Sequence, residues 1–382
     1  MLDRRQKVLL AVSMAIVGFF ATGNFVATRL ESKAPFQPLA IFGQVVSYVS
    51  GDYVEEVDEK EAMEGAIAGF LEGLDPMCDY LESGEVAAYG PTAAAIEKLP
   101  FALSKRYGYG VVLQVEPGSA AETAGLKRGD YVRAVDRIST RDMGLYHIYA
   151  AMLSKPTCEL AIVRESWRAD PITLTLKKTD LVAGAPASVE TGKDGTTVVQ
   201  FRWIRKGAAA VMQRALRASK STPDSHIVLD LRGCGGNDFK EAIGIVSTVV
   251  KGGEVARRKG RAYKEEVFSC AESSFIAAPR LAVLVSSSTT GAAEIVAASL
   301  KSRGAARIFG GRTYGLAREQ KLFRLSGGGG LVLSIYDWAA PDGKVVTGKG
   351  VDPDVVQEAE GTGSGESADP VMDAAIDYLL VD

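Results

Sequence analysis

The chain has 382 residues, 47% of them hydrophobic, so it is long enough to form two or three domains that each bury a core. Its formal net charge of −3 leaves no basic excess to neutralise phosphates, which argues against a nucleic-acid partner. There are two histidines and four cysteines without CxxC spacing, so we expect no metal and no cofactor. Disulfide pairing of the cysteines in an oxidising compartment stays open, because sequence does not fix it.

The N-terminus carries an export signal. Three basic residues within the first seven positions precede an apolar run from Val8 to Ala21, which continues more weakly to Ala27. The small residues Ala21-Thr22-Gly23 would suit cleavage, whereas Val8–Ala27 is about long enough to span a bilayer as an uncleaved anchor. The chain is therefore expected either on the inner membrane facing the periplasm or secreted into the periplasm.

The middle of the chain changes from helices to short strands. Amphipathic helices are predicted over Ile41–Ser50 and Lys60–Leu71, and residues 82–104 form a transition rich in Ala and Gly. From Tyr107 to about Lys178, short apolar runs alternate with turns, which predicts a β-rich unit. Its strands are expected over Gly110–Val115, Tyr131–Val135, Glu159–Arg164 and Ile172–Leu176, with one helix over His147–Leu153.

The rest of the chain alternates strand and helix, which is typical of an α/β domain that holds ligands at the carboxyl ends of its strands. Strands are predicted over Thr196–Phe201, Ile227–Leu229 and Leu281–Val285, and helices over Ala208–Ala218, Phe239–Val250 and Ala292–Leu300. A polar linker over Glu358–Ser367 precedes a last helix, for which Asp369 is the expected N-cap.

Residues 117–130, PGSAAETAGLKRGD, resemble the corresponding stretch of a PDZ domain. Such domains add a peptide strand to a sheet edge and receive its terminal carboxylate on backbone N–H groups. The resemblance implies peptide binding at Tyr109, Gly110, Val111 and Val112. The Gly-Φ-Gly-Φ pattern of the carboxylate loop is loosely echoed by Gly108-Tyr109-Gly110-Val111. The alternative is a spacer domain that binds nothing.

Residues 230–236, DLRGCGG, directly follow a predicted buried strand. Successive glycines expose backbone N–H groups, so Gly233, Gly235 and Gly236 are candidates for an oxyanion-type loop. A phosphate-binding loop is the competing interpretation, but no Gly-Lys-Ser/Thr follows.

Three further segments complete a family pattern: VLVSSSTTGAAEI (residues 283–295), GGRTYGLAREQ (310–320) and PDGKVVTGKGVDPDV (341–355). Taken in order, the motifs resemble the carboxyl-terminal processing peptidases, which are serine endopeptidases with a Ser–Lys pair. The resemblance covers nearly everything after the N-terminal segment. It implies a mixed α+β and α/β multidomain fold, with a PDZ-like β-rich domain before an α/β protease core. The expected divisions are residues 1–30 (signal or anchor), 36–90 (helical region), 100–180 (PDZ-like domain), 190–357 (core) and 358–382 (linker and helix).

The two positions that should carry the chemistry differ from the family pattern. In the family the nucleophilic Ser lies three residues before a Glu, and Glu294 puts Gly291 at that position. The family's Lys follows a Gly, and here Leu316 follows Gly315, although the matching Gln320 is retained. Glycine offers no nucleophile and leucine no proton acceptor, so the Ser–Lys mechanism is lost at these positions.

Several neighbouring residues are candidates to replace the missing Ser and Lys. Thr290 is adjacent to the nucleophile position, but capping of the following helix by Thr289 or Thr290 is the favoured interpretation. Cys234 has no evident partner base, and Arg318 cannot act as a base because its guanidinium stays protonated. His226 precedes a core strand and is expected to be structural.

Three functions stay open at this stage. The first is a protein that binds protein C-termini or unfolded chains without hydrolysis, as an adaptor or as a regulator of an active paralogous peptidase. The second is an active serine-type endopeptidase that trims C-termini with a displaced Thr or Ser. The third is a structural protein of the cell envelope. The expected partners are peptide C-termini and, through the N-terminal segment, the membrane.

Overall fold

The structure, a computed structural model, describes residues 37–381 apart from 142, 167, 193–194, 220–225, 271, 278 and 358–368. The predicted signal or anchor and the polar linker lie outside the described residues. Within the described ranges, no helix combines the length and apolar character needed to cross a membrane. The chain divides into two units, Met1–Glu64 and Gly65–Asp382.

The first unit contains α2 (Gln37–Asp52) and the beginning of α3 (Glu59–Glu72), which confirms the two predicted N-terminal helices. None of the residues of α2 is buried. Three acidic residues lie in the first two turns of α3, where the helix dipole favours negative charge: Glu59, Glu61 and Glu64.

The second unit begins with one element that the sequence analysis missed. Residues 82–104 were expected to be a transition, but they form α4 (Ser83–Ile96) and most of strand β2. Glycines and an internal Pro91 obscured the helix. Its alanines favour helix, and the Glu85 carboxylate accepts the Glu82 N–H at 2.8 Å at its N-terminus.

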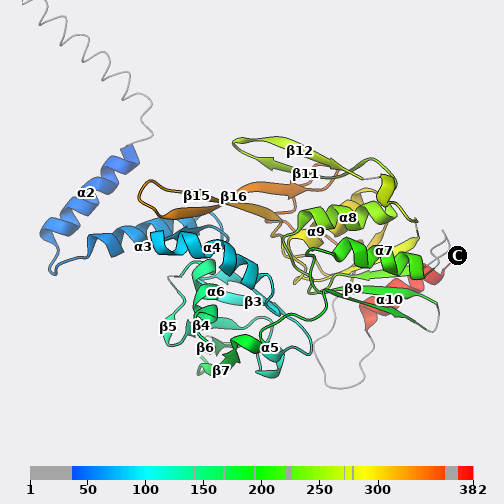
Figure 1. Ribbon diagram of the computed structural model, residues 1–382, viewed down its shortest axis with the longest axis horizontal. Coiled ribbons are helices and arrows are strands. Elements are labelled where there is room, and N and C mark those ends of the chain that lie inside the picture. The colour runs from blue at the N-terminus through cyan, green and yellow to red at the C-terminus, as the bar shows by residue number, and fades with distance from the viewer. Residues whose placement is uncertain are drawn as a thin grey trace, which may run out of the picture. The chain divides into compact units, whose positions relative to one another are not determined.

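A β-rich domain follows, with the strand order β2-β3-β4-β6-β7 and β5 paired to β4 (Figure 1). Its interior is a separate apolar cluster to which helix α6 contributes Ile148 and Met152. The strands are β2 (Phe101–Arg106), β3 (Tyr109–Val115), β4 (Tyr131–Val135), β5 (Ile138–Ser139), β6 (Thr157–Val163) and β7 (Ile172–Lys177). The helices are α5 (Ala120–Thr123), α6 (Leu145–Ser154) and the 3-10 turn η1 (Lys178–Asp180).

The α/β domain is built on a six-stranded sheet, in the order β17-β14-β13-β10-β9-β8, that is parallel except for β8. Helices α7, α8 and α9 cover one face and α10 covers the other (Figure 1). The strands are β8 (Ala187–Thr191), β9 (Thr197–Phe201), β10 (His226–Asp230), β13 (Arg280–Val285), β14 (Arg307–Gly310) and β17 (Val355–Val356). The helices are α7 (Ala208–Ala218), α8 (Phe239–Val249), α9 (Ala292–Ser302) and α10 (Pro370–Leu380).

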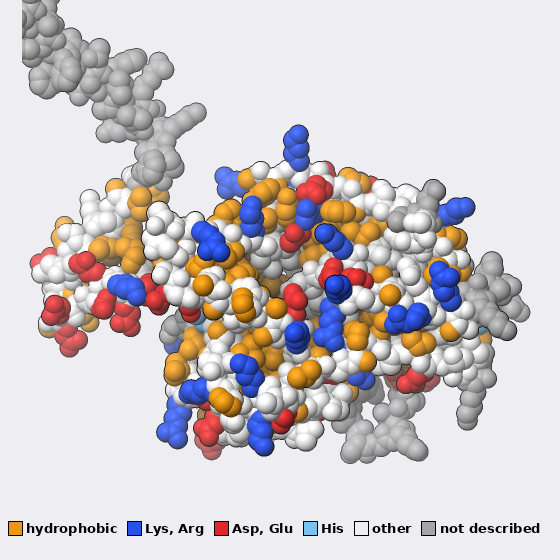
Figure 2. All heavy atoms as spheres, in the orientation of Figure 1, with side chains coloured by type: hydrophobic (Ala, Val, Ile, Leu, Met, Phe, Trp, Pro, Cys, Tyr) orange, Lys and Arg blue, Asp and Glu red, His pale blue; other side chains and the backbone are white. Residues whose placement is uncertain are grey.

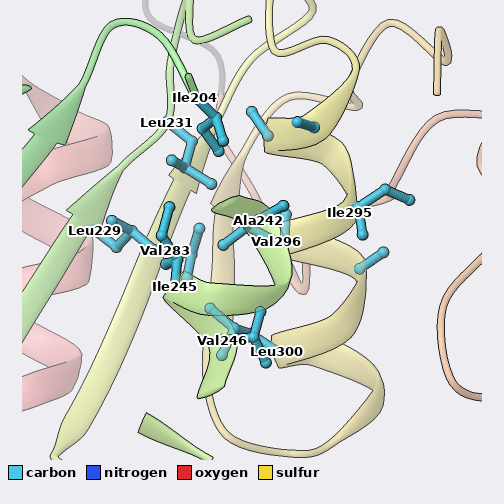
Figure 3. Packing of buried hydrophobic residues seen from close by; sticks show 14 of the residues in the cluster. Ile204, Leu229, Leu231, Ala242, Ile245, Val246, Val283, Ile295, Val296 and Leu300 are labelled. Carbon is cyan, nitrogen blue, oxygen red and sulfur yellow. The ribbon is translucent and has the colours of Figure 1, made fainter. Parts of the chain in front are cut away.

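Side chains along the central strands point alternately to the two faces of the sheet, which explains why helices pack on both. Leu229 and Val283 point to Ile245 of α8 and Val296 of α9 (Figure 3), whereas Val228 and Leu284 face α10. Because both faces are covered, the strands are apolar throughout, as expected for a parallel sheet. Asp369 accepts the Met372 N–H at 3.1 Å, which confirms it as the N-cap of α10.

A third sheet was not predicted. It contains β1 (Asp79–Leu81), β11 (Glu254–Gly260), β12 (Tyr263–Ser269), β15 (Arg318–Arg324) and β16 (Gly330–Ala339), and the short helix η2 (Glu272–Ser274) follows β12. The ten-residue β16 pairs with β15 along one edge and with both β1 and β11 along the other. This sheet therefore connects the region around residue 80 with the α/β domain. Charged side chains of both signs are scattered over the drawn face rather than gathered in one basic stripe (Figure 2).

Candidate active site

The candidate site lies where two neighbouring parallel strands end. Strand β10 leads into the Gly-rich loop, and β13 leads into the Ser/Thr loop that precedes α9. The Thr290 N–H donates to the Cys234 carbonyl at 2.9 Å, and the Ala292 N–H donates to the Gly236 carbonyl at 2.8 Å. Backbone bonds therefore join the two loops on both sides of Gly291.

Gly291, the N-cap of α9, has φ of 60° and ψ of −124°, a backbone conformation that glycine adopts freely and that would be strained for a residue with a Cβ. A sharp, strained strand-to-helix turn is also the setting of nucleophiles in other hydrolases. However, a Cβ at this position would lie 2.4 Å from the Gly236 carbonyl oxygen. The Gly-rich loop thus takes the space that a serine side chain would need.

Glu294 connects the two altered positions. Its carboxylate is fully buried and accepts hydrogen bonds from the Gly291 N–H at 3.0 Å and from the Leu316 N–H at 2.7 Å. The Gly315 N–H and the Thr313 hydroxyl donate to it at 2.6 and 2.5 Å. Burial raises the pKa of Glu294, against the opposing effect of these four donors. The sequence used Glu294 only to set the register; a single acid in a nearly apolar helix was the signal of this role.

Leu316 is half-buried and has no group that could act as a base. The Gln320 side-chain amide donates to the Ser334 hydroxyl at 3.3 Å and to the Arg318 carbonyl at 3.5 Å. Among the described residues, no hydrogen bond links Gln320 to Gly291 or Leu316. Glu294 therefore joins Gly291 to Leu316, whereas Gln320 contributes to the β15–β16 hairpin.

The expectation that a threonine caps α9 is wrong, because the N-cap is Gly291. The Thr289 hydroxyl accepts the Ser286 N–H at 3.0 Å and donates to the Leu231 carbonyl at 2.7 Å, so it closes the turn and ties it to the neighbouring strand end. Thr290 is buried, and over the described part of the chain no hydrogen bond joins its hydroxyl to a basic side chain. Thr290 thus lacks the activating base that nucleophilic catalysis requires.

The other candidate groups are also unsuited to catalysis. Cys234 is fully buried, and burial raises the pKa of its thiol well above the usual value, so it is protonated and unreactive. All four cysteines are free, which excludes the intrachain disulfides left open by the sequence. His226 begins β10, roughly 13 Å along the strand from its end at Asp230. Arg318 pairs with Asp75 and Asp337 at 2.8 and 2.9 Å.

The candidate oxyanion loop directs its polar groups into the protein. The Gly233 N–H donates to the Ser286 hydroxyl at 3.3 Å, and the Gly235 N–H donates to the Arg202 carbonyl at 3.4 Å. The Gly236 carbonyl takes the Ala292 N–H, the amide that follows the nucleophile position. Of the three candidate glycines, the N–H groups of Gly233 and Gly235 are therefore already bonded within the protein, whereas an oxyanion hole needs donors aimed at the developing charge.

The predicted peptide-binding residues need a correction. Tyr109, Gly110, Val111 and Val112 lie at the start of β3, which pairs there with β2 on one side and with β4 on the other. Tyr107 and Gly108 form the β2–β3 turn, with φ of 54° and 82°. The sequence pattern was therefore a hairpin turn and not a carboxylate loop. Because both edges of β3 are paired at these residues, they cannot add a peptide strand.

The β-rich domain contacts the loops of the candidate site. The Tyr314 hydroxyl lies 3.1 Å from the Ser104 hydroxyl of β2, and Arg128 donates to Ser287. The Gln114 side-chain nitrogen of β3 would lie 3.4 Å from a Cβ on Gly235. None of these contacts between distant segments could be predicted from local patterns.

Comparison with known proteins gives this arrangement a context. Residues 196–357 match peptidase family S41, and residues 111–158 match the PDZ domain. The chloroplastic C-terminal processing peptidase of Tetradesmus obliquus is 26% identical over 327 residues, which cover 80% of this chain and 70% of that protein. The carboxy-terminal processing protease CtpA of Bacillus subtilis is 23% identical over 354 residues, covering 91% and 75%. A solved structure of a photosystem II D1 C-terminal processing protease has the same fold, with a TM-score of 0.68 and 24% identity, covering 84% of this chain and 87% of that one.

Proposed function

The chain is a member of the carboxyl-terminal processing peptidase family, with a PDZ domain before an S41 domain, and we propose that it binds protein C-termini or unfolded chains without cutting them. Its relatives are proteases, so the proposal separates binding from hydrolysis. The separation rests on the residues of the candidate site and not on the fold.

The observation that carries the proposal is the closure over Gly291. The nucleophile position has no side chain, and the Gly236 carbonyl lies where a side chain would begin. Leu316 stands at the position of the general base. Loss of such a pair typically costs on the order of 10⁶ in turnover, which leaves only binding.

The displaced-threonine alternative has less support. A hydroxyl nucleophile needs a base within about 3 Å. Thr289 uses its hydroxyl in two backbone hydrogen bonds. The Glu294 carboxylate is bonded to the backbone of the site, but it already accepts four hydrogen bonds.

We place this binding activity in the cell envelope, where the protein would act as an adaptor or as a regulator of an active paralogous peptidase. The basic and apolar start of the sequence supports export. The core keeps its fold although both catalytic positions differ from the family pattern. This supports the proposal that the protein is retained for binding. Fractionation of cells that express the full chain tests the location, and recovery in the cytosol would contradict it.

A proteolysis assay tests the absence of hydrolysis. The full chain is incubated with an unfolded protein that ends in apolar residues, and the products are followed by mass spectrometry. We expect no cleavage above the blank. Cleavage that is abolished by Thr290→Ala but retained in Ser154→Ala, an exposed serine at the end of α6, would establish the displaced-threonine peptidase instead.

A binding assay tests the other half of the proposal. Two fluorescent peptides of one sequence are compared, one with a free C-terminal carboxylate and one amidated. We expect the acid to bind more tightly, by roughly tenfold for a lost charge-assisted contact. Equal affinities would remove tail capture, and absence of binding would favour a structural envelope protein.

A further inference from the structure

Helix α2 has an apolar face that the described part of the protein leaves exposed. At about 100° per residue, its large apolar side chains fall on one half of the helix circumference. They are Leu39, Ile41, Phe42, Val45, Val46, Tyr48 and Val49. The opposite half carries small or uncharged polar residues: Ala40, Gly43, Gln44, Ser47, Ser50 and Gly51. None of the residues of α2 is buried, and Leu39, Val45 and Tyr48 are 61%, 50% and 68% exposed.

The charge of α2 limits what its apolar face can bind. The helix has one charged residue, Asp52, at its last position, and it contains no Lys or Arg. Helices that bind anionic surfaces by charge carry Lys and Arg on the polar face. The affinity of α2 for a partner must therefore come from burial of apolar side chains.

The width of the apolar face distinguishes two kinds of partner. Two helices that pair as a coiled coil bury a narrow seam of residues spaced three and four apart. In α2 that seam would begin at Leu39 and Phe42, and it would leave the exposed Ile41, Val45 and Tyr48 in water. A helix that lies in the plane of a membrane interface can instead bury a whole apolar half in lipid. The face of α2 has the width that the membrane interface requires.

The sequence also brings α2 close to a bilayer. The apolar run predicted to be an export signal or anchor ends at Ala27, and only residues 28–36 separate it from Gln37. This connection spans at most about 30 Å when fully extended. A retained anchor therefore keeps the start of α2 near the membrane surface. With 16 residues, α2 is shorter than the roughly 20 residues that a spanning helix needs, so it can lie on a bilayer but not cross it.

We infer that α2 lies in the interface of a phospholipid membrane, with its apolar half in the lipid and its Gly/Ser/Gln half toward water. The inference goes beyond the proposed function and takes from it only the location in the cell envelope. Because α2 carries no cation, it should bind zwitterionic and anionic lipid surfaces alike.

Site-specific fluorescence of the full chain in phospholipid vesicles tests this inference. The environment-sensitive label NBD is attached to Val45→Cys on the apolar half or, as the matched control, to Ser47→Cys on the opposite half. The four native cysteines are buried, so the introduced thiol is the one that reacts. The label at position 45 should shift its emission to the blue, and nitroxides on the lipid acyl chains should quench it about threefold more than the label at position 47. Vesicles of phosphatidylcholine, with or without phosphatidylglycerol, should give the same result.

Two charge substitutions in the Val45→Cys background sharpen the test. Val49→Glu places a carboxylate on the apolar half and should reduce quenching to the level of the label at position 47, because a charge is costly in hydrocarbon. Ser47→Glu adds the same charge to the opposite half and should leave quenching unchanged. Neither residue is buried, so the urea midpoint should stay that of the wild type in both variants.

Three outcomes would overturn the inference. The first is equal quenching of the two labels, or quenching at position 45 that survives Val49→Glu. The second is quenching only in vesicles that contain phosphatidylglycerol. The third is a blue shift at position 45 without quenching by lipid, which would identify a second copy of the chain as the cover. Since the measurement uses no peptide, its failure and that of the proposed tail binding are distinguishable.

Discussion

The candidate active site and the side of β2 that faces α6 are both occupied by groups of the chain itself, but the groups differ in kind. At the active site, backbone closes on backbone: the Gly236 carbonyl takes the Ala292 N–H and fills the space beside Gly291. Beside β2, side chains do this: the Tyr149 hydroxyl accepts the Leu103 N–H, and Glu72 pairs with Lys105. Backbone closure can be undone only by moving loops, whereas side chains can change rotamer. The comparison thus separates a region held by backbone contacts from one held by side chains.

The largest effect is expected where the backbone closes. Gly291→Ser should lower the free energy of unfolding by about 3 kcal/mol, because it adds both a strained φ and a contact with the Gly236 carbonyl. Urea denaturation measures the loss. Gly304→Ser is the control, because Gly304 has nearly the same φ, 61°, with open space around it, and should cost about 1 kcal/mol.

The double variant Gly291→Ser with Leu316→Lys extends this test to activity. It restores both residues of the family's Ser–Lys pair but leaves the Gly236 carbonyl in place, so we expect it to remain without hydrolysis. Equal stability of Gly291→Ser and Gly304→Ser, together with cleavage by the double variant, would show that the loop moves readily. The contrast between the two regions would then be broken.

An intermediate effect is expected from pH at helix α6. His147 of α6 lies between Asp79 and Glu85, with each contact at 3.1 Å. Burial alone would lower the pKa of His147, but the hydrogen bonds and charges of the two acids outweigh it and raise the pKa to about 9. The stabilisation is therefore complete below the unfolded pKa of about 6.5 and is lost as the pH rises through 9.

The size of this effect is on the order of 2 kcal/mol. Urea midpoints of the wild type and of His147→Gln, measured from pH 6 to 9.5, give it as a difference in which the other titrating groups cancel. The difference should shrink toward high pH. A difference that is constant with pH would mean that the histidine is not charged in the folded protein.

The sequence predicted the α/β domain well because its strands are continuously apolar and its helices begin beside clear turn signals. It missed the third sheet because strands such as β11, with the sequence EVARRKG, have the composition of a surface loop. Arg258 of this strand pairs with Glu266 and Glu319 and lies 4.3 Å from the centre of the Tyr336 ring. Those partners lie 8 to 78 residues away, so no local pattern indicates them.

The candidate site could also be predicted only in part, because its contacts join segments that are distant in sequence. The register set by Glu294 identified Gly291, and the preceding Gly315 identified Leu316, as the altered positions. It could not reveal that Glu294 binds the backbone of both, or that the Gly236 carbonyl occupies the nucleophile's space, because these contacts join loops that are distant in sequence. The hairpin at Tyr107-Gly108 was misread because a glycine-rich turn and a carboxylate loop have similar sequences.

The smallest effect is expected at the contact between Tyr149 of α6 and Leu103 of β2. Tyr149→Phe removes the hydroxyl that accepts the Leu103 N–H and leaves the ring, which stacks with Phe101 at 6.4 Å between centroids. The variant should lose about 1 kcal/mol of unfolding free energy, because one buried N–H becomes unpaired. Because that donor is then free to bind a peptide carbonyl, affinity for the acid peptide should rise by a few-fold even though stability falls.

Phe101→Leu, which disturbs the same packing but keeps the hydroxyl, should lower stability without any gain in binding. If Tyr149→Phe binds the acid peptide no more tightly, the contact between Tyr149 and Leu103 serves packing alone.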